Sequence, residues 1–202
     1  MHRWAAFLLA LVLAGCGGGG ESKTRAFAPS WPAPLAPMDM TKLAGLQPET
    51  HEFVFLHVHA HLDVFVDTAH VTVPAAIGIN TYDPAVRRFK APDGSIGYGG
   101  ISPPCETPCI SPLHTHFPDG ILHTEAKEHQ FNTLGEFFTE WNIRLDDDCV
   151  QDFCRPDTPI AVYVDGEKFS GDPRSIQLQD KREIAVVIGT PPKEIPSSFP
   201  GG

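Results

Sequence analysis

The stretch EFVFLHVHAHLDVFV, residues 52–66, decides the fold because its side chains alternate in character. Its even positions are almost wholly apolar, whereas its odd positions carry His57, His59 and His61. Because successive side chains of a strand point to opposite faces, this parity predicts a strand with three histidines on one face and an apolar face behind them. A helix would scatter the same histidines around its axis. We expect the strand to turn at residues 67–70 and return antiparallel.

A second histidine-bearing segment, LHTHFPDGILHTE, occupies residues 113–125. Its central Pro-Asp-Gly sequence is typical of a turn, since proline fixes φ, aspartate tolerates the bend and glycine accepts a positive φ. The flanking runs favour strands, so the segment is predicted to form a hairpin. If the loop comprises residues 117–120, His114 lies directly opposite His123 on one face.

Three imidazoles and one carboxylate are expected to converge in this hairpin. Cross-strand neighbours have Cβ atoms about 4.5–5.5 Å apart, and His114 and His116 are about 6.6–6.8 Å apart along their strand. In the same register His116 lies opposite Ile121. Glu125 shares the parity of His123, and it could be a fourth metal ligand, a general base or the acceptor that orients an imidazole.

The row of first-strand histidines is too long for a single metal ion. His57 and His61 are about 13 Å apart along the backbone, whereas zinc–nitrogen bonds are about 2.0–2.1 Å long. Adjacent members of the row can share an ion. The histidines of the two segments therefore imply either one site with spare groups around it or two neighbouring sites, and both alternatives stay open.

The ligand types indicate which metals to expect. Imidazole combined with a carboxylate suits Zn(II) or Cu(II), with Fe(II) or Mn(II) less favoured. A thioether-rich Cu(I) site is disfavoured because Met38 and Met40 are the only methionines beyond the start of the chain. A buried histidine network that becomes charged as pH falls is a competing interpretation, although it would need no converging hairpin.

These features favour a metal-binding protein that stores, buffers or delivers its ion. One alternative is a mononuclear metalloenzyme of hydrolase or hydratase type, in which Glu125 or a nearby histidine acts as general base. Another is an interaction module in which a metal only holds the fold together. The chain has no Ser/His/Asp elbow, phosphate-binding loop or dinucleotide fingerprint, which argues against covalent hydrolysis and nucleotide chemistry.

The remaining sequence predicts an α+β fold with a mainly antiparallel β-sheet, one principal α-helix and disulfide-bearing loops. A capping box at residues 133–136 opens the helix, and residues 80–104 are expected to form a long loop. Further strands are expected at 160–164, 175–179 and 183–189. The apolar stripe of the helix is expected in the core and consists of Leu134, Phe137, Phe138 and Trp141.

The cysteines fit an exported protein. Four of the five lie in two short loops, namely Cys105 with Cys109 and Cys149 with Cys154. An even count outside the cytoplasm favours two local disulfides over an alternative in which Cys105 or Cys109 binds metal as a thiolate, although four cysteines allow three pairings.

The start of the chain carries an export signal. A short positive segment at residues 1–3 precedes an apolar run at 4–14, which is too short to span a membrane as a mature helix. The sequence Leu13-Ala14-Gly15-Cys16 resembles the lipobox of bacterial lipoprotein precursors. The resemblance implies a signal peptide cleaved before Cys16, acyl chains such as palmitate on that residue, and a cell-envelope location facing the periplasm or the exterior. The alternative is an ordinary secretory signal in which Cys16 is incidental.

Charge and organisation complete the prediction. Loss of Arg3 with the leader takes the net charge from −10 to −11, which argues against nucleic acid and against electrostatic binding to anionic lipid. The lipid would therefore supply the membrane attachment. The expected organisation is a signal peptide at 1–15, a lipidated cysteine with a Gly/Pro-rich tether at 16–42, a single metal-binding domain at 43–191 and a flexible tail at 192–202.

Overall fold

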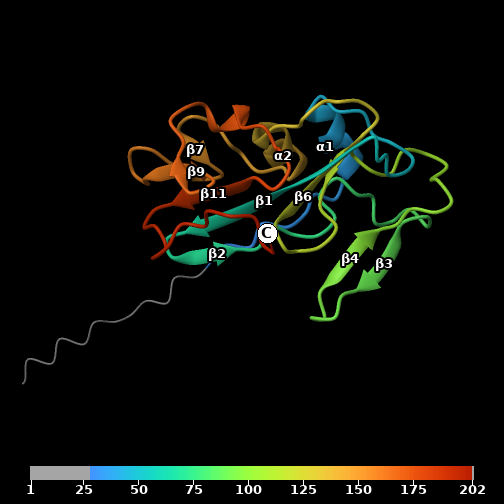
Figure 1. Ribbon diagram of the computed structural model, residues 1–202, viewed down its shortest axis with the longest axis horizontal. Coiled ribbons are helices and arrows are strands. Elements are labelled where there is room, and N and C mark those ends of the chain that lie inside the picture. The colour runs from blue at the N-terminus through green and yellow to red at the C-terminus, as the bar shows by residue number, and fades with distance from the viewer. Residues whose placement is uncertain (1–27, 202) are drawn as a thin grey trace, which may run out of the picture.

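The computed structural model describes residues 28–201 (Figure 1). The predicted leader and the lipidation of Cys16 lie outside these residues. Between residues 28 and 201, no helix combines the length and the apolar character needed to cross a bilayer.

The body of the fold is a seven-stranded sheet, which confirms the predicted α+β class. Six strands follow the order β10-β9-β11-β1-β6-β5, and β2 pairs with β1 beside this path. The strands are β1 (Leu56–Val66), β2 (Ala69–Val71), β5 (Leu113–His114), β6 (Ile121–Ala126), β9 (Ile160–Val164), β10 (Glu167–Lys168) and β11 (Glu183–Ile188).

Strand β1 is the centre of the sheet. Its first half pairs antiparallel with β6, and its second half pairs antiparallel with β2 after the tight turn at residues 67–68. On the other edge it pairs parallel with β11, the one parallel pairing of this sheet within residues 28–201. The strand begins at Leu56 rather than at Glu52, and the exposed Val54 and Phe55 precede it.

The alternation of β1 divides the sheet into a core face and a polar face. Its even-numbered residues are all buried, and the core cluster includes four of them, Ala60, Leu62, Val64 and Val66. The same cluster contains the apolar stripe of helix α2 (Leu134–Glu140). The predicted capping box is present, because Thr133 accepts a hydrogen bond from the Glu136 amide while Glu136 accepts one from the Thr133 amide. Helix α2 therefore covers the face opposite the odd-numbered histidines.

Part of the predicted tether is instead built into the domain. Helix α1 (Pro37–Leu43) packs against α2. Trp31 is 9% exposed and contacts Trp141 edge to face, and its carbonyl accepts a hydrogen bond from Trp141 Nε1. Within this segment Trp31, Pro37 and Thr41 are buried, whereas Leu35 is 86% exposed, so part of it packs on the core.

Two small hairpins complete the fold. The predicted long loop contains β3 (Arg87–Lys90) and β4 (Ile96–Gly99), which project from the main body in Figure 1. The strands β7 (Cys149–Val150) and β8 (Phe153–Cys154) are joined by the Cys149–Cys154 disulfide. Cys105 and Cys109 form the second disulfide, so the preference for local pairing is confirmed and neither pair offers thiolate ligands.

One C-terminal prediction is wrong. The strand expected at residues 175–179 is replaced by the short 3-10 helix η1 (Pro173–Ser175) and a single bridge between Gln177 and Thr133. In the C-terminal segment, the centroid of the Phe199 ring lies 6.4 Å from that of His61.

Candidate metal site

Three adjacent strands bring most of the candidate residues to one face of the sheet. Strand β6 lies between β1 and β5. His57 is paired with Glu125 and His59 with His123 across β1 and β6, while His114 is paired with His123 across β5 and β6, as the hairpin prediction required. The pleat of each strand therefore directs these side chains to the same side.

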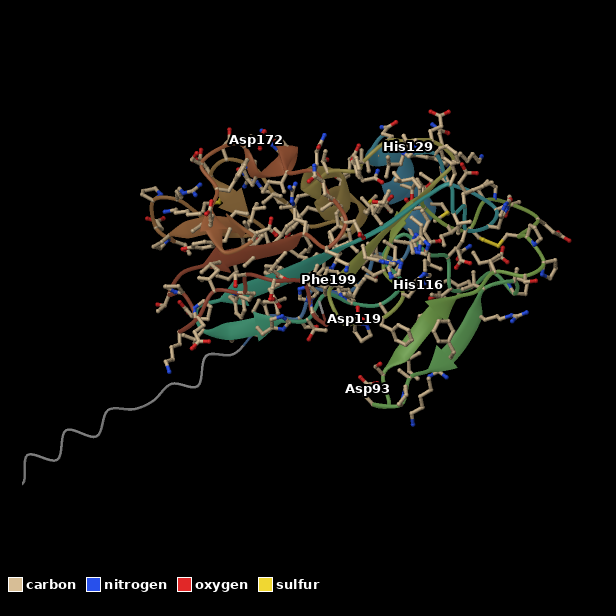
Figure 2. All side chains as sticks on the ribbon, viewed as in Figure 1. Asp93, His116, Asp119, His129, Asp172 and Phe199 are labelled. Atoms are coloured by element: carbon tan, nitrogen blue, oxygen red, sulfur yellow. A yellow bond between two sulfur atoms is a disulfide. The ribbon has the colours of Figure 1, made fainter. Side chains whose placement is uncertain are left out.

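His116 reaches the site by a different route from the one predicted. It lies beyond the end of β5, and Ile121, its predicted partner, pairs with His61 instead. The chain after His114 leaves β6 and approaches β4, where the His116 carbonyl accepts a hydrogen bond from the Tyr98 amide. Figure 2 shows His116 where the β3–β4 hairpin meets the main body, with Asp93 at the far tip of that hairpin.

Four side chains form what we call the inner cluster: His114, His116, His123 and Glu125. The Nε2 atoms of His114 and His116 are 3.3 Å apart, and Nδ1 of His123 is 3.4 Å from Oε1 of Glu125. The same Oε1 lies 3.9 Å from His114 Nε2 and 3.8 Å from His116 Nε2. Tetrahedral ligands at bond lengths of about 2.0–2.1 Å are about 3.3–3.4 Å from one another. The inner cluster therefore has nearly the spacing of a tetrahedral ligand set.

Backbone carbonyls orient two of these imidazoles. Nδ1 of His114 donates to the Ser111 carbonyl at 2.8 Å, and Nδ1 of His116 donates to the Tyr98 carbonyl at 2.6 Å. Since a carbonyl can only accept, both rings carry their proton on Nδ1 when neutral and direct the Nε2 lone pair at the cluster. His123 Nδ1 is buried and has no hydrogen-bond partner within residues 28–201. Such an unpaired buried nitrogen fits a position intended for a ligand.

The electrostatics favour ligands in their metal-binding forms. Burial and the neighbouring His116 lower the pKa of His114 to about 3, so this ring is neutral at neutral pH. Burial also lowers the pKa of His123. Burial alone would raise the pKa of Glu125, but contacts with His116 and His123 lower it overall and keep the carboxylate ionised. Neutral imidazole and ionised carboxylate are the states that bind metal.

His116 is the exception. Burial alone would lower its pKa, but Glu125 and the Tyr98 carbonyl raise it overall. Protonation of this ring would therefore compete with binding of a metal through Nε2.

Two further histidines, which we call the outer pair, lie at the edge of the inner cluster. The Nε2 atoms of His57 and His59 are 3.0 Å apart, and His57 Nε2 is 3.2 Å from Glu125 Oε1. The side chain of His57 is 41% exposed, whereas that of His114 is fully buried. His59 and His57 together with His123 also have ligand atoms close enough to hold an ion.

His61, the third histidine of the first strand, faces a different environment. Its Nδ1 is 2.9 Å from Glu183 Oε2 and its Nε2 is 3.0 Å from the Asp119 carbonyl. Burial would lower its pKa, but Glu183 and Asp63 raise it overall. The side chains of His61, Asp63 and Glu183 form a group of their own, separate from the inner cluster. This separation agrees with the expectation that one ion cannot bind both His57 and His61.

Sequence reasoning missed the groups that position the candidate ligands. The Ser111 and Tyr98 contacts come from main-chain carbonyls, which every residue possesses, so no residue type marks them. Glu183 lies far along the chain from His61 and reaches it only through the parallel pairing of β11 with β1.

The protein is thus a disulfide-bearing α+β domain, and its inner cluster and outer pair are histidine groups that could hold a metal ion. No family model, curated protein or solved structure matches the chain.

Proposed function

We propose that the protein binds a transition metal ion in the inner cluster and stores, buffers or delivers it at the cell envelope. The observation that carries the proposal is the spacing of the four ligand atoms, at 3.3–3.9 Å in the four pairs described above. In these pairs the separations exceed the tetrahedral spacing of about 3.3–3.4 Å by at most about 0.6 Å.

The ligand set supports Zn(II) or Cu(II) as the ion. Three imidazoles and a carboxylate are borderline ligands, which both ions accept, whereas Fe(II) and Mn(II) are less favoured. The two disulfides remove four cysteines from the candidate ligands, so a soft thiolate site is not available from these residues.

Storage or delivery is favoured over the two alternatives. Four protein ligands fill a tetrahedral ion and leave no open position for a water or substrate, which a catalytic zinc site retains. Glu125 would be a ligand rather than a free general base. The hydrophobic core lies on the opposite face of the sheet and includes Trp141 and Phe137, so the fold does not depend on a metal for its apolar packing.

Metal content measured by mass spectrometry of residues 21–202 tests the proposal. We expect one equivalent of Zn(II) or Cu(II) in this protein and less than a tenth of that in the His114→Ala/His116→Ala variant. His70→Ala/His129→Ala is the matched control, because both histidines are exposed and lie outside the inner cluster and the outer pair. A parent protein that neither carries metal nor binds Zn(II) or Cu(II) tightly would refute the proposal.

The location at the cell envelope rests on the lipobox-like sequence at Cys16. We propose that the mature protein is lipid-anchored at this cysteine. Several acyl chains on one residue would attach the protein stably to the membrane, whereas a single chain would not. Labelled palmitate should be incorporated into the chain expressed in bacteria and lost in the Cys16→Ser variant. Equal labelling of both would contradict the anchoring.

A further inference from the structure

We propose that the outer pair, His57 and His59, is an entry position through which a single metal ion reaches and leaves the inner cluster, with Glu125 as the ligand shared by both positions. This inference rests on the proposed function and adds to it the route and the direction of delivery.

The contacts of Glu125 link the two positions. Its Oε1 is 3.2 Å from His57 Nε2 on the outer side and 3.4 Å from His123 Nδ1 on the inner side. The His59 ring is also close to that of His123, with centroids 4.4 Å apart. An ion bound by the outer pair could therefore take Glu125 as a further ligand before it releases either outer imidazole. Ligand exchange of this stepwise kind avoids a bare ion in the low-dielectric interior.

Burial gives the route a direction. His57 has a side chain exposed to 41%, whereas Glu125 is exposed to 6% and His114 is fully buried. Hydrogen bonds to the Ser111 and Tyr98 carbonyls hold the rings of His114 and His116. The Nε2 atoms of the outer pair, in contrast, have polar contacts within residues 28–201 only with each other and with Glu125. The outer pair is thus more accessible to solvent than the inner cluster and is held by fewer hydrogen bonds.

Charge favours one travelling ion over two resident ions. Glu125 is the only carboxylate among the six side chains of the inner cluster and the outer pair. Two divalent ions in neighbouring sites are about 3.5–4 Å apart, and their repulsion at that distance requires more negative charge than one carboxylate supplies. Asp180 approaches His59 through the backbone amide at 3.2 Å and does not reach the Nε2 atoms of the outer pair by any observed contact.

The proposal makes a kinetic rather than an equilibrium prediction. An entry position that is not part of the final site changes the rates of binding and release by the same factor and leaves their ratio, the affinity, nearly constant. Replacement of both outer histidines by glutamine, which retains a polar side chain of similar length, should therefore slow both processes.

Stopped-flow measurements on the full chain purified in detergent test this, with Zn(II) for binding and an excess of chelator for release. We expect His57→Gln/His59→Gln to bind one equivalent, as the parent does, with both rates reduced roughly tenfold, equivalent to about 1.4 kcal/mol of barrier. His70→Gln/His129→Gln is the control and should retain the parent rates. Circular dichroism melting of the metal-free variants separates a kinetic effect from misfolding.

Three results would overturn the entry position. Unchanged rates in the outer variant would show that the ion takes another route. Two equivalents in the parent and one in the outer variant would identify a separate second site. A lost equivalent without a second site would make the outer histidines ligands of the final complex. If the parent binds no metal, the proposed function itself fails, and that result is distinct from these three.

Discussion

At the scale of single residues, Gly99 provides the space for the His116 ring. It ends β4 with φ of +146°, and a Cβ atom added there would lie 2.5 Å from His116 Nδ1 and 2.7 Å from its Cε1. The neighbouring Tyr98 carbonyl holds the same Nδ1. A side chain at Gly99 must therefore displace the imidazole, so this glycine serves the inner cluster as well as the turn of the backbone.

We expect Gly99→Ala to weaken metal binding by about 10–100-fold, the usual effect of disturbing a group that orients a ligand. Gly94→Ala is the matched control. Gly94 has φ of +93° in the same hairpin, but its added Cβ would meet only Lys90 Cε at 3.6 Å. Isothermal titration of both variants with Zn(II) measures the difference. Equal affinities would show that His116 does not need its observed position.

The sequence predicted the arrangement of the candidate ligands better than the groups that support them. Strand parity and the Pro-Asp-Gly turn were sufficient to place His114 opposite His123, because cross-strand register follows from the loop length. The position of His116 could not be found in this way. Its strand ends early, and a contact with the distant β4 replaces the expected pairing with Ile121.

At the scale of elements, Glu140 joins the two helices to the segment before β5. This fully buried carboxyl has Oε1 2.5 Å from Ser111 Oγ and Oε2 3.0 Å from Thr41 Oγ1. Burial raises the pKa of Glu140 to about 7 despite both hydroxyl contacts. The folded protein therefore favours the neutral acid.

This pKa predicts that the contribution of Glu140 to stability declines as the solution becomes more basic. Because the folded state holds this proton to about pH 7 and the unfolded state only to about pH 4.5, the contribution of Glu140 to the free energy of unfolding should fall between these values, whereas that of His114, whose pKa is lowered, rises with pH. The loss is on the order of 3 kcal/mol. Glu140→Gln should remove this slope, and urea unfolding of both proteins with chelator at pH 5 and pH 8 measures it. Parallel pH profiles would contradict the assignment.

Prediction of the elements succeeded where the signal is local. The capping box and the apolar stripe of α2 lie within a few residues of each other, and the structure confirms both. Helix α1 was missed because its sequence is rich in proline and it is stabilised by contacts with the distant α2. The β3–β4 hairpin was missed although its turn contains Pro92-Asp93-Gly94, the same local signal that predicted the other hairpin.

At the scale of the whole molecule, metal binding should stabilise the fold without being required for it. A ligand present at a hundredfold excess over its dissociation constant adds about 2.7 kcal/mol to the free energy of unfolding. For a domain of this size that raises the unfolding temperature by about 5–10 °C. Calorimetry with Zn(II) and then with chelator measures the change. A chelated protein that unfolds at once would instead support a structural metal.

The fold class could be inferred because one strand, β1, contains the pattern that separates core from site. Its even-numbered residues form the core and its odd-numbered histidines face the other way. The parallel pairing with β11 could not be inferred, since it joins residues more than a hundred positions apart in the chain and no residue pattern in either strand indicates its partner.

The docking of Trp31 on Trp141 sets how far the domain can stand from a membrane. If the proposed lipid is attached at Cys16, only the chain from there to Ala28 separates the bilayer from the described domain. Those twelve peptide links reach at most about 43 Å even when fully extended. The start of the domain would then be held near the membrane surface, so a protein that exchanges metal with it would have to reach it there.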